Sequence, residues 1–463
     1  MTDRPFLTSL FRMESVSSRS LGAFRILYGL VMCFSLTRFM LSGWVEELLV
    51  KPTFFFKYAW ATWMPVWSPT GLYVHIGLTL IAAVGVTLGL YFRGSLAVFV
   101  LGFTSLQLMD QTNYLNHYYL VICLAVPLGL SAAGKTLSLD CSLRQRPKER
   151  HVPYWQVDLL RFQLGIVYVF AAVAKFSSDW LLYGQPLSIW LSARGDLPLI
   201  GDLLTAPRTA LLMSWAGFLY DLLIVPALLY TRTRPLAYLL VIAFHSMTWA
   251  LFDIGVFPIL MTLLTPIFFA PDWPKRVCVL FTNGETNDQP RHSTRPPSGG
   301  LRALLKTLII AWCLFHLIFP LRGFWLDENI SWSERGMRYS WRVMVREKMG
   351  SLTYRVQSKQ SGREWEVNPK VFLQPRQLSE MCTQPDMIVQ LSHWIKQDFE
   401  RRLDSPVAVY ADAWVSLNGR APKRLINHML DLTQVSPYAE GLILPAPASP
   451  PLIKPSPLPL SQP

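Results

Sequence analysis

Residues 154–177, YWQVDLLRFQLGIVYVFAAVAKFS, form the stretch that decides the fold, a long apolar run that ends at Lys175. A helix that crosses a bilayer needs about 20 apolar residues, and this run is long enough. Eight similar stretches occur elsewhere, so that the candidate spans are 21–41, 71–92, 94–109, 118–133, 154–177, 207–230, 235–252, 254–270 and 303–321. We therefore predict a multi-span α-helical membrane protein with about nine transmembrane helices, the seventh and eighth of which alternatively form a re-entrant pair.

Charge divides the chain into parts that the average composition hides. Over the 463 residues, 51% are hydrophobic and 16% are charged. Asp, Glu, Lys and Arg make up about 13% of residues 1–320 but about 22% of residues 321–463. We expect a transmembrane domain over 1–322, a smaller C-terminal domain of mixed α/β, β-rich structure over 323–436, and a Pro-rich disordered tail over 437–463.

The basic residues predict which way the chain crosses the membrane. With nine spans and a cytoplasmic N-terminus, the cytoplasmic loops hold 16 Lys and Arg and the opposite loops hold 3. Such a bias marks the cytoplasmic side, so the C-terminal domain is expected to be periplasmic or lumenal, in a bacterial inner or cell membrane or in the endoplasmic reticulum. Because these loops also hold most of the net charge of +13, the expected partner is the lipid bilayer and not nucleic acid.

The cysteines and the C-terminal patterns narrow the class further. The six cysteines include no CxxC, and only Cys382 falls in the C-terminal domain, so neither a disulfide framework there nor a metal site is expected. Alternation of apolar and polar residues predicts strands over 339–345, 352–357 and 407–417, and a helix over 387–403. Residues 282–300 are expected to be a cytoplasmic linker.

A few polar residues remain in or beside the spans, where ionisable groups are costly and often functional. On the predicted topology all of them lie at the outer end of the membrane domain, beside the C-terminal domain. They are Asn116, His117, Lys175, Arg194, His245 and Asp253.

Lys175 is the strongest candidate, because an apolar helix delivers it to the interface and desolvation there favours the neutral amine, which can act as a general base. The alternative is that Lys175 reaches toward headgroups or pairs with Asp179, one turn further on. Arg161 lies on the same face at roughly 21 Å from Lys175, too far for direct chemistry. Arg161 is expected to pair with Asp221 or with Asp158.

The other candidates have several possible roles. His117 suits an acid or base, a hydrogen-bond donor to an anion or, less well, a metal ligand, and Asn116 offers amide donors to an oxyanion or enolate. The alternative for both is loop capping. For His245, the default is a buried histidine whose hydrogen bonds are satisfied.

Several strings resemble the vitamin K-dependent gamma-glutamyl carboxylases and their bacterial relatives, which carry a horizontally transferred transmembrane domain. The resemblance covers residues 17–433, and its most specific parts are the turn at Asn116 and His117 and the end of the helix at Lys175. In chain order the strings are SLGAFRILYGLVM (20–32), DQTNYLNHYYL (110–120), LLRFQLGIVYVFAAVAKFSSDW (159–180), FLYDLLIVPALLY (218–230), FHSMTWALFDIGVF (244–257), YSWRVMV (339–345), VNPKVFLQPRQ (367–377) and VAVYADAWVSLNGR (407–420).

The resemblance implies an enzyme that oxygenates reduced vitamin K, as phylloquinol or menaquinol. The strong base so formed removes a proton from the γ-carbon of a glutamate in a protein or peptide, CO2 adds there, and the quinone leaves as its epoxide. By the same resemblance, Lys175 is the base that deprotonates the quinol and Asn116 and His117 lie beside the reacting centre. Arg194 and His245 are expected to contact substrate.

The stretch 367–377 resembles the family's glutamate-substrate region, which implies that Asn368, Phe372 and Arg376 bind substrate. Arg376 suits a carboxylate.

Some residues depart from the family pattern. The position before Lys175 is Ala174, where the animal enzymes have a second lysine, and Glu366 stands where they have tyrosine. Cys382 has no evident partner for the family's bridge between its two parts, and we expect the long C-terminal sheet region of the animal enzymes to be absent. Two alternatives therefore stay open. One is a quinol oxidase or epoxidase without efficient glutamate carboxylation, and the other is a non-enzymatic membrane transporter or scaffold.

Overall fold

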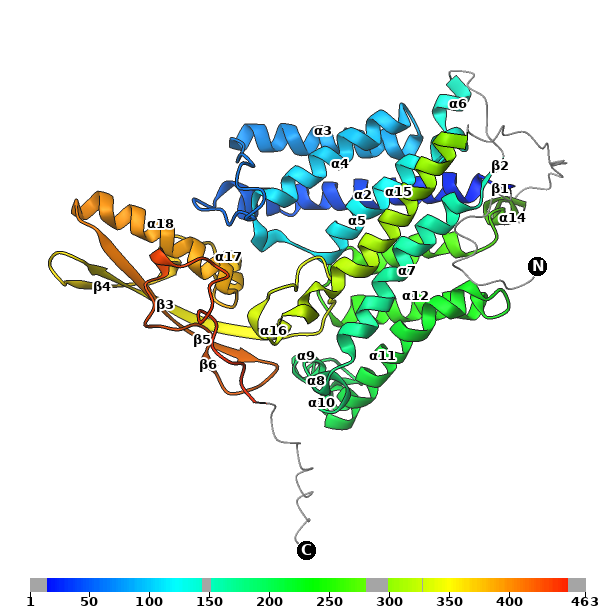
Figure 1. Ribbon diagram of the computed structural model, residues 1–463. Coiled ribbons are helices and arrows are strands. Elements are labelled where there is room, and N and C mark those ends of the chain that lie inside the picture. Colours follow the sequence, from blue (N-terminus) through cyan, green and yellow to red (C-terminus); the bar gives the residue numbers. More distant parts are fainter. Residues whose placement is uncertain (1–14, 144–150, 280–298, 327, 449–463) are drawn as a thin grey trace, which may run out of the picture.

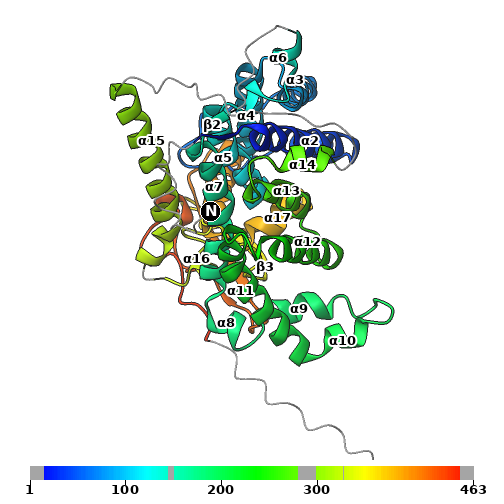
Figure 2. The same cartoon turned by 90° about the vertical axis from the view of Figure 1, so that its right-hand side faces the viewer.

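The computed structural model describes residues 15–143, 151–279, 299–326 and 328–448 (Figure 1). A large helical part comes first in the chain, and a smaller part built around a sheet lies against one end of it. Turned by 90°, the helical part shows α15 standing at one edge (Figure 2).

Each of the nine apolar stretches forms a helix. The helices are α2 (Arg19–Leu41), α3 (Pro69–Leu88), α4 (Phe92–Met109), α5 (Asn116–Leu130), α7 (Trp155–Lys175), α11 (Pro207–Leu229), α12 (Arg234–Leu251), α13 (Phe257–Leu264) and α15 (Gly299–Ile318). Within the described ranges, six are long and apolar enough to cross a membrane, namely α2, α3, α4, α7, α11 and α15. The predicted count of nine spans is therefore not confirmed, because α5 and the segment Phe257–Phe268 are shorter apolar helices.

Short elements occupy the connections. They are β1 (Ser15–Ser17), η1 (Glu46–Val50), η2 (Gln111–Asn113), η3 (Ala133–Lys135), α6 (Leu139–Leu143), β2 (His151–Pro153), α8 (Ser178–Leu181), α9 (Leu187–Ser192), α10 (Gly201–Thr205), η4 (Thr265–Phe268) and α14 (Trp273–Val279). Helix α3 illustrates how local sequence sets the ends. Ser68 accepts a hydrogen bond from the Gly71 amide at its start, and Gly89 ends it with φ +67°, where an added Cβ would lie 2.4 Å from the Arg25 guanidinium.

Connecting segments make contacts at two opposite ends of the helical part. At the end near the N-terminus, β1 pairs antiparallel with β2, and buried Arg25 donates to the carbonyls of Val86 and Ala133. At the other end, the Lys57 amide donates to Gln390 and Asn418 donates to Asp179, across to the C-terminal part. The predicted orientation of the chain across the membrane stays a prediction.

The C-terminal domain is a four-stranded antiparallel sheet in the order β4-β3-β5-β6, with helix α18 packed on it. Two of the predicted strands and the predicted helix are confirmed, because 352–357 lies in β3, 407–417 is β5, and 387–403 lies in α18. Its elements are η5 (Phe319–Trp325), α16 (Ile330–Ser333), β3 (Lys348–Ser358), β4 (Glu364–Val367), η6 (Pro369–Val371), α17 (Pro375–Met381), α18 (Pro385–Leu403), β5 (Val407–Leu417), β6 (Lys423–Arg424) and η7 (Leu432–Gln434).

The prediction of a strand over 339–345 is wrong. Tyr339, Trp341 and Met344 have φ of +62°, +56° and +52°, in the left-handed region that breaks an extended run. Each such residue costs about 1 kcal/mol or more and persists only where surrounding contacts fix it. Here Trp341 is fully buried and stacks on Tyr119 of α5 with ring centroids 4.7 Å apart. The segment 339–345 is therefore an irregular strap fastened to the membrane part.

The predicted start of the disordered tail at 437 is too early. Leu442 is fully buried in the core of the C-terminal domain, and Ile443 forms a β-bridge with Ile426. The Trp332 indole donates to the Leu444 carbonyl at 2.7 Å. The remainder of the predicted tail, 449–463, lies outside the described residues, as does nearly all of the predicted linker 282–300.

Candidate functional site

Lys175 and Asp221 form a buried ion pair between α7 and α11. The Lys175 Nζ donates to the Asp221 Oδ2 at 2.7 Å, and the side chains are only 7% and 5% exposed. The indole of Trp180 lies 5.1 Å from the same nitrogen. The expectation of a lysine in purely apolar surroundings is therefore wrong, because a carboxylate partner reaches it from the neighbouring helix. A charge-assisted hydrogen bond of this kind holds the lysine nitrogen in one position.

The alternative partners expected for these charges are corrected at the same time. Asp179 does not pair with Lys175, since both of its oxygens accept from the Arg420 guanidinium, at 2.6 and 2.8 Å. Arg161 does not reach Asp221, but it does form the other predicted pair, with Asp158 at 3.1 Å.

A small buried cavity of about 80 Å³ opens beside the ion pair. His245 lies on its wall, where Nε2 makes a 3.0 Å hydrogen bond with the Tyr168 hydroxyl. The other ring nitrogen, Nδ1, is buried and has no hydrogen-bond partner among the described residues, so the default of a satisfied histidine is not confirmed. A buried polar atom left without a partner is a place where a ligand can add a hydrogen bond.

His117 lies in a second cavity of about 790 Å³. It belongs to the first turn of α5 and is buried, and Gly255 faces its ring, where an added Cβ would lie 3.7 Å away, at ordinary van der Waals distance. Asn116, beside it, accepts from the Tyr114 hydroxyl at 3.0 Å and donates to the Arg342 carbonyl at 3.4 Å. Neither side chain caps the helix, whose N-cap residue is Leu115.

One layer of side chains separates the two cavities. The residues that line both are Phe252, Ile254, Phe257, Val343 and Met344. Lys175 and His117 therefore lie on opposite sides of a thin apolar wall, to which the strap 339–345 contributes two of the five residues. The structure thus brings together two of the predicted catalytic residues that lie far apart in the sequence.

A third cavity of about 740 Å³, here called the polar cavity, lies between the two parts of the molecule. Asn116, Asp253 and Ile254 line both this cavity and that of His117. Arg194 also lines the polar cavity, donating to the Leu251 carbonyl at 2.9 Å and approaching the exposed Asp253 carboxylate at 3.6 Å.

Two family models match the chain, one to each of its parts. The model described as the HTTM domain matches residues 13–273, and the model described as "Vitamin K-dependent gamma-carboxylase, lumenal domain" matches residues 301–446. The chain belongs to the vitamin K-dependent gamma-carboxylase family. With its apolar helices, it is a multi-pass membrane protein of that family. No solved structure matches it.

Of the three residues in 367–377 that were predicted to bind substrate, Arg376 alone lines one of these cavities. Arg376 lines the His117 cavity and donates to the Thr112 carbonyl at 3.4 Å. Asn368 is exposed and accepts from the Lys370 amide, and the Phe372 ring packs on Trp394 at 4.7 Å, inside the C-terminal domain. Neither Asn368 nor Phe372 lines any of the three cavities.

Three features of the site are not predicted by the sequence. Asp221 pairs with Lys175 and not with Arg161, and its place in the family-like string FLYDLLIVPALLY is the only signal for it. Val343 and Met344 of the wall, and Arg342 beside them, belong to YSWRVMV, which resembles the family but whose alternating pattern predicts only a strand.

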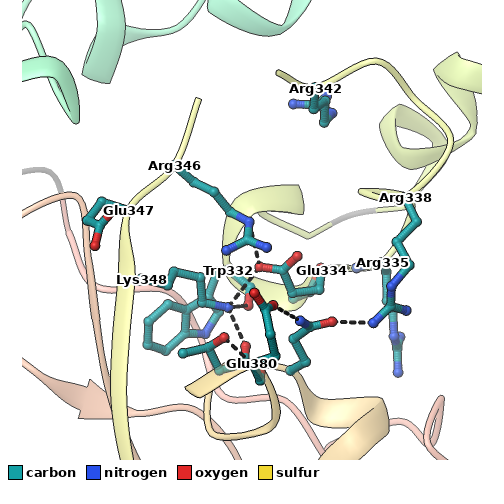
Figure 3. Close-up of polar contacts among 12 residues, drawn as sticks. Trp332, Glu334, Arg335, Arg338, Arg342, Arg346, Glu347, Lys348 and Glu380 are labelled. Carbon is teal, nitrogen blue, oxygen red and sulfur yellow. Dashed lines mark hydrogen bonds and ion pairs between the residues drawn. The ribbon is translucent and has the colours of Figure 1, made fainter. Parts of the chain in front are cut away.

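A second cluster of buried charges lies where the C-terminal domain meets the membrane part (Figure 3). Lys348 is fully buried and donates to the carbonyls of Trp332 and Thr383 at 2.9 and 2.6 Å, and to Glu334 at 3.2 Å. Burial lowers the pKa of Lys348 to about 8. Glu334 also pairs with Arg346 at 3.1 Å, so that one carboxylate is shared by two cations.

Proposed function

We propose that the protein uses reduced vitamin K to carboxylate glutamate side chains of a protein or peptide. The observation that carries the proposal is the Lys175–Asp221 pair, buried beside a cavity and one side-chain layer from His117, in a chain of this family. Phylloquinol or menaquinol is the proposed cofactor and O2 and CO2 the co-substrates. The proposed orientation has a cytoplasmic N-terminus and the C-terminal domain on the periplasmic or lumenal side.

The residues present fit a lipid-soluble quinol. A ring with two hydroxyl groups needs apolar walls and a few polar groups, and these cavities offer both. Lys175 has one hydrogen-bond partner among the described residues, and His245 Nδ1 has none. A further apolar cavity of about 1040 Å³, lined by Tyr118, Ile122 and Val126 of α5 and by Phe315 of α15, is large enough for an isoprenoid or phytyl chain.

When bound, reduced vitamin K would react with O2 to supply the strong base that allows CO2 to add at the glutamate γ-carbon. The chain's own part is to move the first proton and to exclude water. Once its own proton has passed to Asp221, Lys175 Nζ is placed to accept a proton from a quinol hydroxyl, and Asp221 holds the amine in position throughout. Asn116 and His117 would donate hydrogen bonds to anionic oxygen on the other side of the apolar wall.

Incorporation of labelled bicarbonate into a glutamate peptide, with reduced vitamin K and the detergent-solubilised protein, tests this proposal. Wild type should incorporate label and form epoxide, and Lys175→Ala should lose both. The matched control is Lys359→Ala, which removes an exposed lysine on the sheet surface that pairs with Asp431 at 3.2 Å. Unchanged activity in Lys175→Ala would overturn the assigned base.

A second candidate function is quinol epoxidation without efficient carboxylation. It is favoured by the positions of Asn368 and Phe372, which lie away from the cavities, and by Glu366, which is exposed on β4. Epoxide formed without label in any of several glutamate peptides would select this function.

A further inference from the structure

Four arginines line the polar cavity, and three of them form an ion pair with a described residue. Arg338 pairs with Asp386 at 3.0 Å and Arg346 with Glu334 at 3.1 Å, while Arg194 approaches Asp253. Arg342 is the exception. Within the described ranges it forms no ion pair, and Figure 3 shows it apart from the linked charges below it.

The surroundings of Arg342 make an anionic ligand favourable there. Its guanidinium lies over the exposed Phe324 ring at 5.0 Å, a contact that leaves its hydrogen-bond donors free. Burial and the nearby Arg322 lower its pKa, and Glu334 only partly opposes this. Arginine nevertheless stays charged near neutral pH. A half-buried cation without a partner gains more from a carboxylate than one in open solvent does.

The backbone directs Arg342 toward the reacting centre. Its carbonyl accepts from Asn116, next to His117, and the following residues Val343 and Met344 form the wall beside Lys175. Trp341 and Met344 on either side have left-handed backbone conformations, fixed by the burial of the tryptophan. These strained backbone conformations therefore hold Arg342 in the wall of the polar cavity.

We propose that Arg342 binds the carboxylate of the glutamate substrate as it enters through the polar cavity. This inference rests on the proposed function and assigns to Arg342 the role that the sequence suggested for Arg376. A guanidinium binds a carboxylate through two parallel hydrogen bonds. Neutralising the γ-carboxylate also makes removal of the neighbouring γ-proton easier, because charge builds up there in the transition state.

Binding of two labelled peptides to the full-length protein in detergent tests the inference. They differ only in a single glutamate or glutamine. Arg342→Gln should weaken the glutamate peptide by about 10-fold or more, the value of a charge-assisted hydrogen bond, and leave the glutamine peptide unchanged. Arg342→Lys should fall between wild type and Arg342→Gln. The control is Arg355→Gln, an exposed arginine on β3 paired with Glu364, which should alter neither affinity.

Equal affinity of wild type and Arg342→Gln for the glutamate peptide would overturn the inference, as would a wild type that does not distinguish the two peptides. If Arg342→Gln does not fold, by thermal unfolding, Arg342→Lys decides, because it must lose affinity for the glutamate peptide alone. The proposed function has a separate test. It would be wrong if wild type incorporated no label into any peptide, even if wild type still bound the glutamate peptide more tightly than Arg342→Gln does.

Discussion

Lys175 and Lys348 are both buried and both pair with a carboxylate, but they differ in how many of their hydrogen-bond donors are used. An ammonium group has three hydrogen-bond donors. Lys348 uses them on two backbone carbonyls and Glu334. Lys175 has a single partner among the described residues, Asp221, and it borders a cavity. A lysine whose three donors are all used on the protein stabilises the fold. A lysine with unused donors beside a cavity can also bind a ligand.

The largest expected effect comes from Lys175. Lys175→Met should lower quinol-dependent turnover by about 100- to 10,000-fold, the usual contribution of a positioned acid or base. It should also destabilise the protein, since Asp221 is left buried without a partner. Steady-state epoxide formation and thermal unfolding in detergent measure the two effects.

The double variant Lys175→Met with Asp221→Asn separates them. It should regain most of the lost stability, because no unpaired charge remains, but none of the turnover. Recovery of turnover in the double variant would show that the pair serves structure alone.

Lys348→Met should lower stability but leave turnover nearly unchanged. Glu334 keeps Arg346, so we expect a loss of about 3 kcal/mol in the free energy of unfolding, the low end for breaking a buried pair. Turnover per folded molecule should change less than about twofold, far below a catalytic effect. If folded Lys348→Met lost as much turnover as Lys175→Met, the assignment of a purely structural role to Lys348 would be wrong.

The smallest effect concerns pH. The pKa of Lys348 is about 8 in the folded protein, against 10.5 as its ordinary value. Between these two values the unfolded chain binds more protons, so wild type should gain stability relative to Lys348→Met as pH rises, by at most about 1.4 kcal/mol per unit. Thermal unfolding of both proteins at several pH values gives the difference, in which other groups cancel. A constant or falling difference would contradict it.

The sequence predicted the helical stretches and strand β5, because the period of the hydrophobic residues is a local signal that a bilayer and a sheet both enforce strongly. It also singled out Lys175 and His117, since a polar residue at the end of an apolar run is conspicuous.

Pairing across helices could not be predicted in the same way. Sequence spacing allows Asp221 to form an ion pair with either Arg161 or Lys175. The packing of α11 on α7 brings it to Lys175. The strap 339–345 alternates like a strand, yet the rings of Tyr119 and Trp341 stack and override that local preference. The role of Arg342 depends on which neighbours are already paired, which is a property of the folded cluster.

The strap also bears on how such proteins can be recombined. Because Val343 and Met344 complete a wall inside the membrane part, the boundary of the sheet domain is not a boundary of the site. A chimera that joins this helical part to the sheet domain of a relative should be cut after residue 347, not near 323, so that the native strap stays with the helices it contacts.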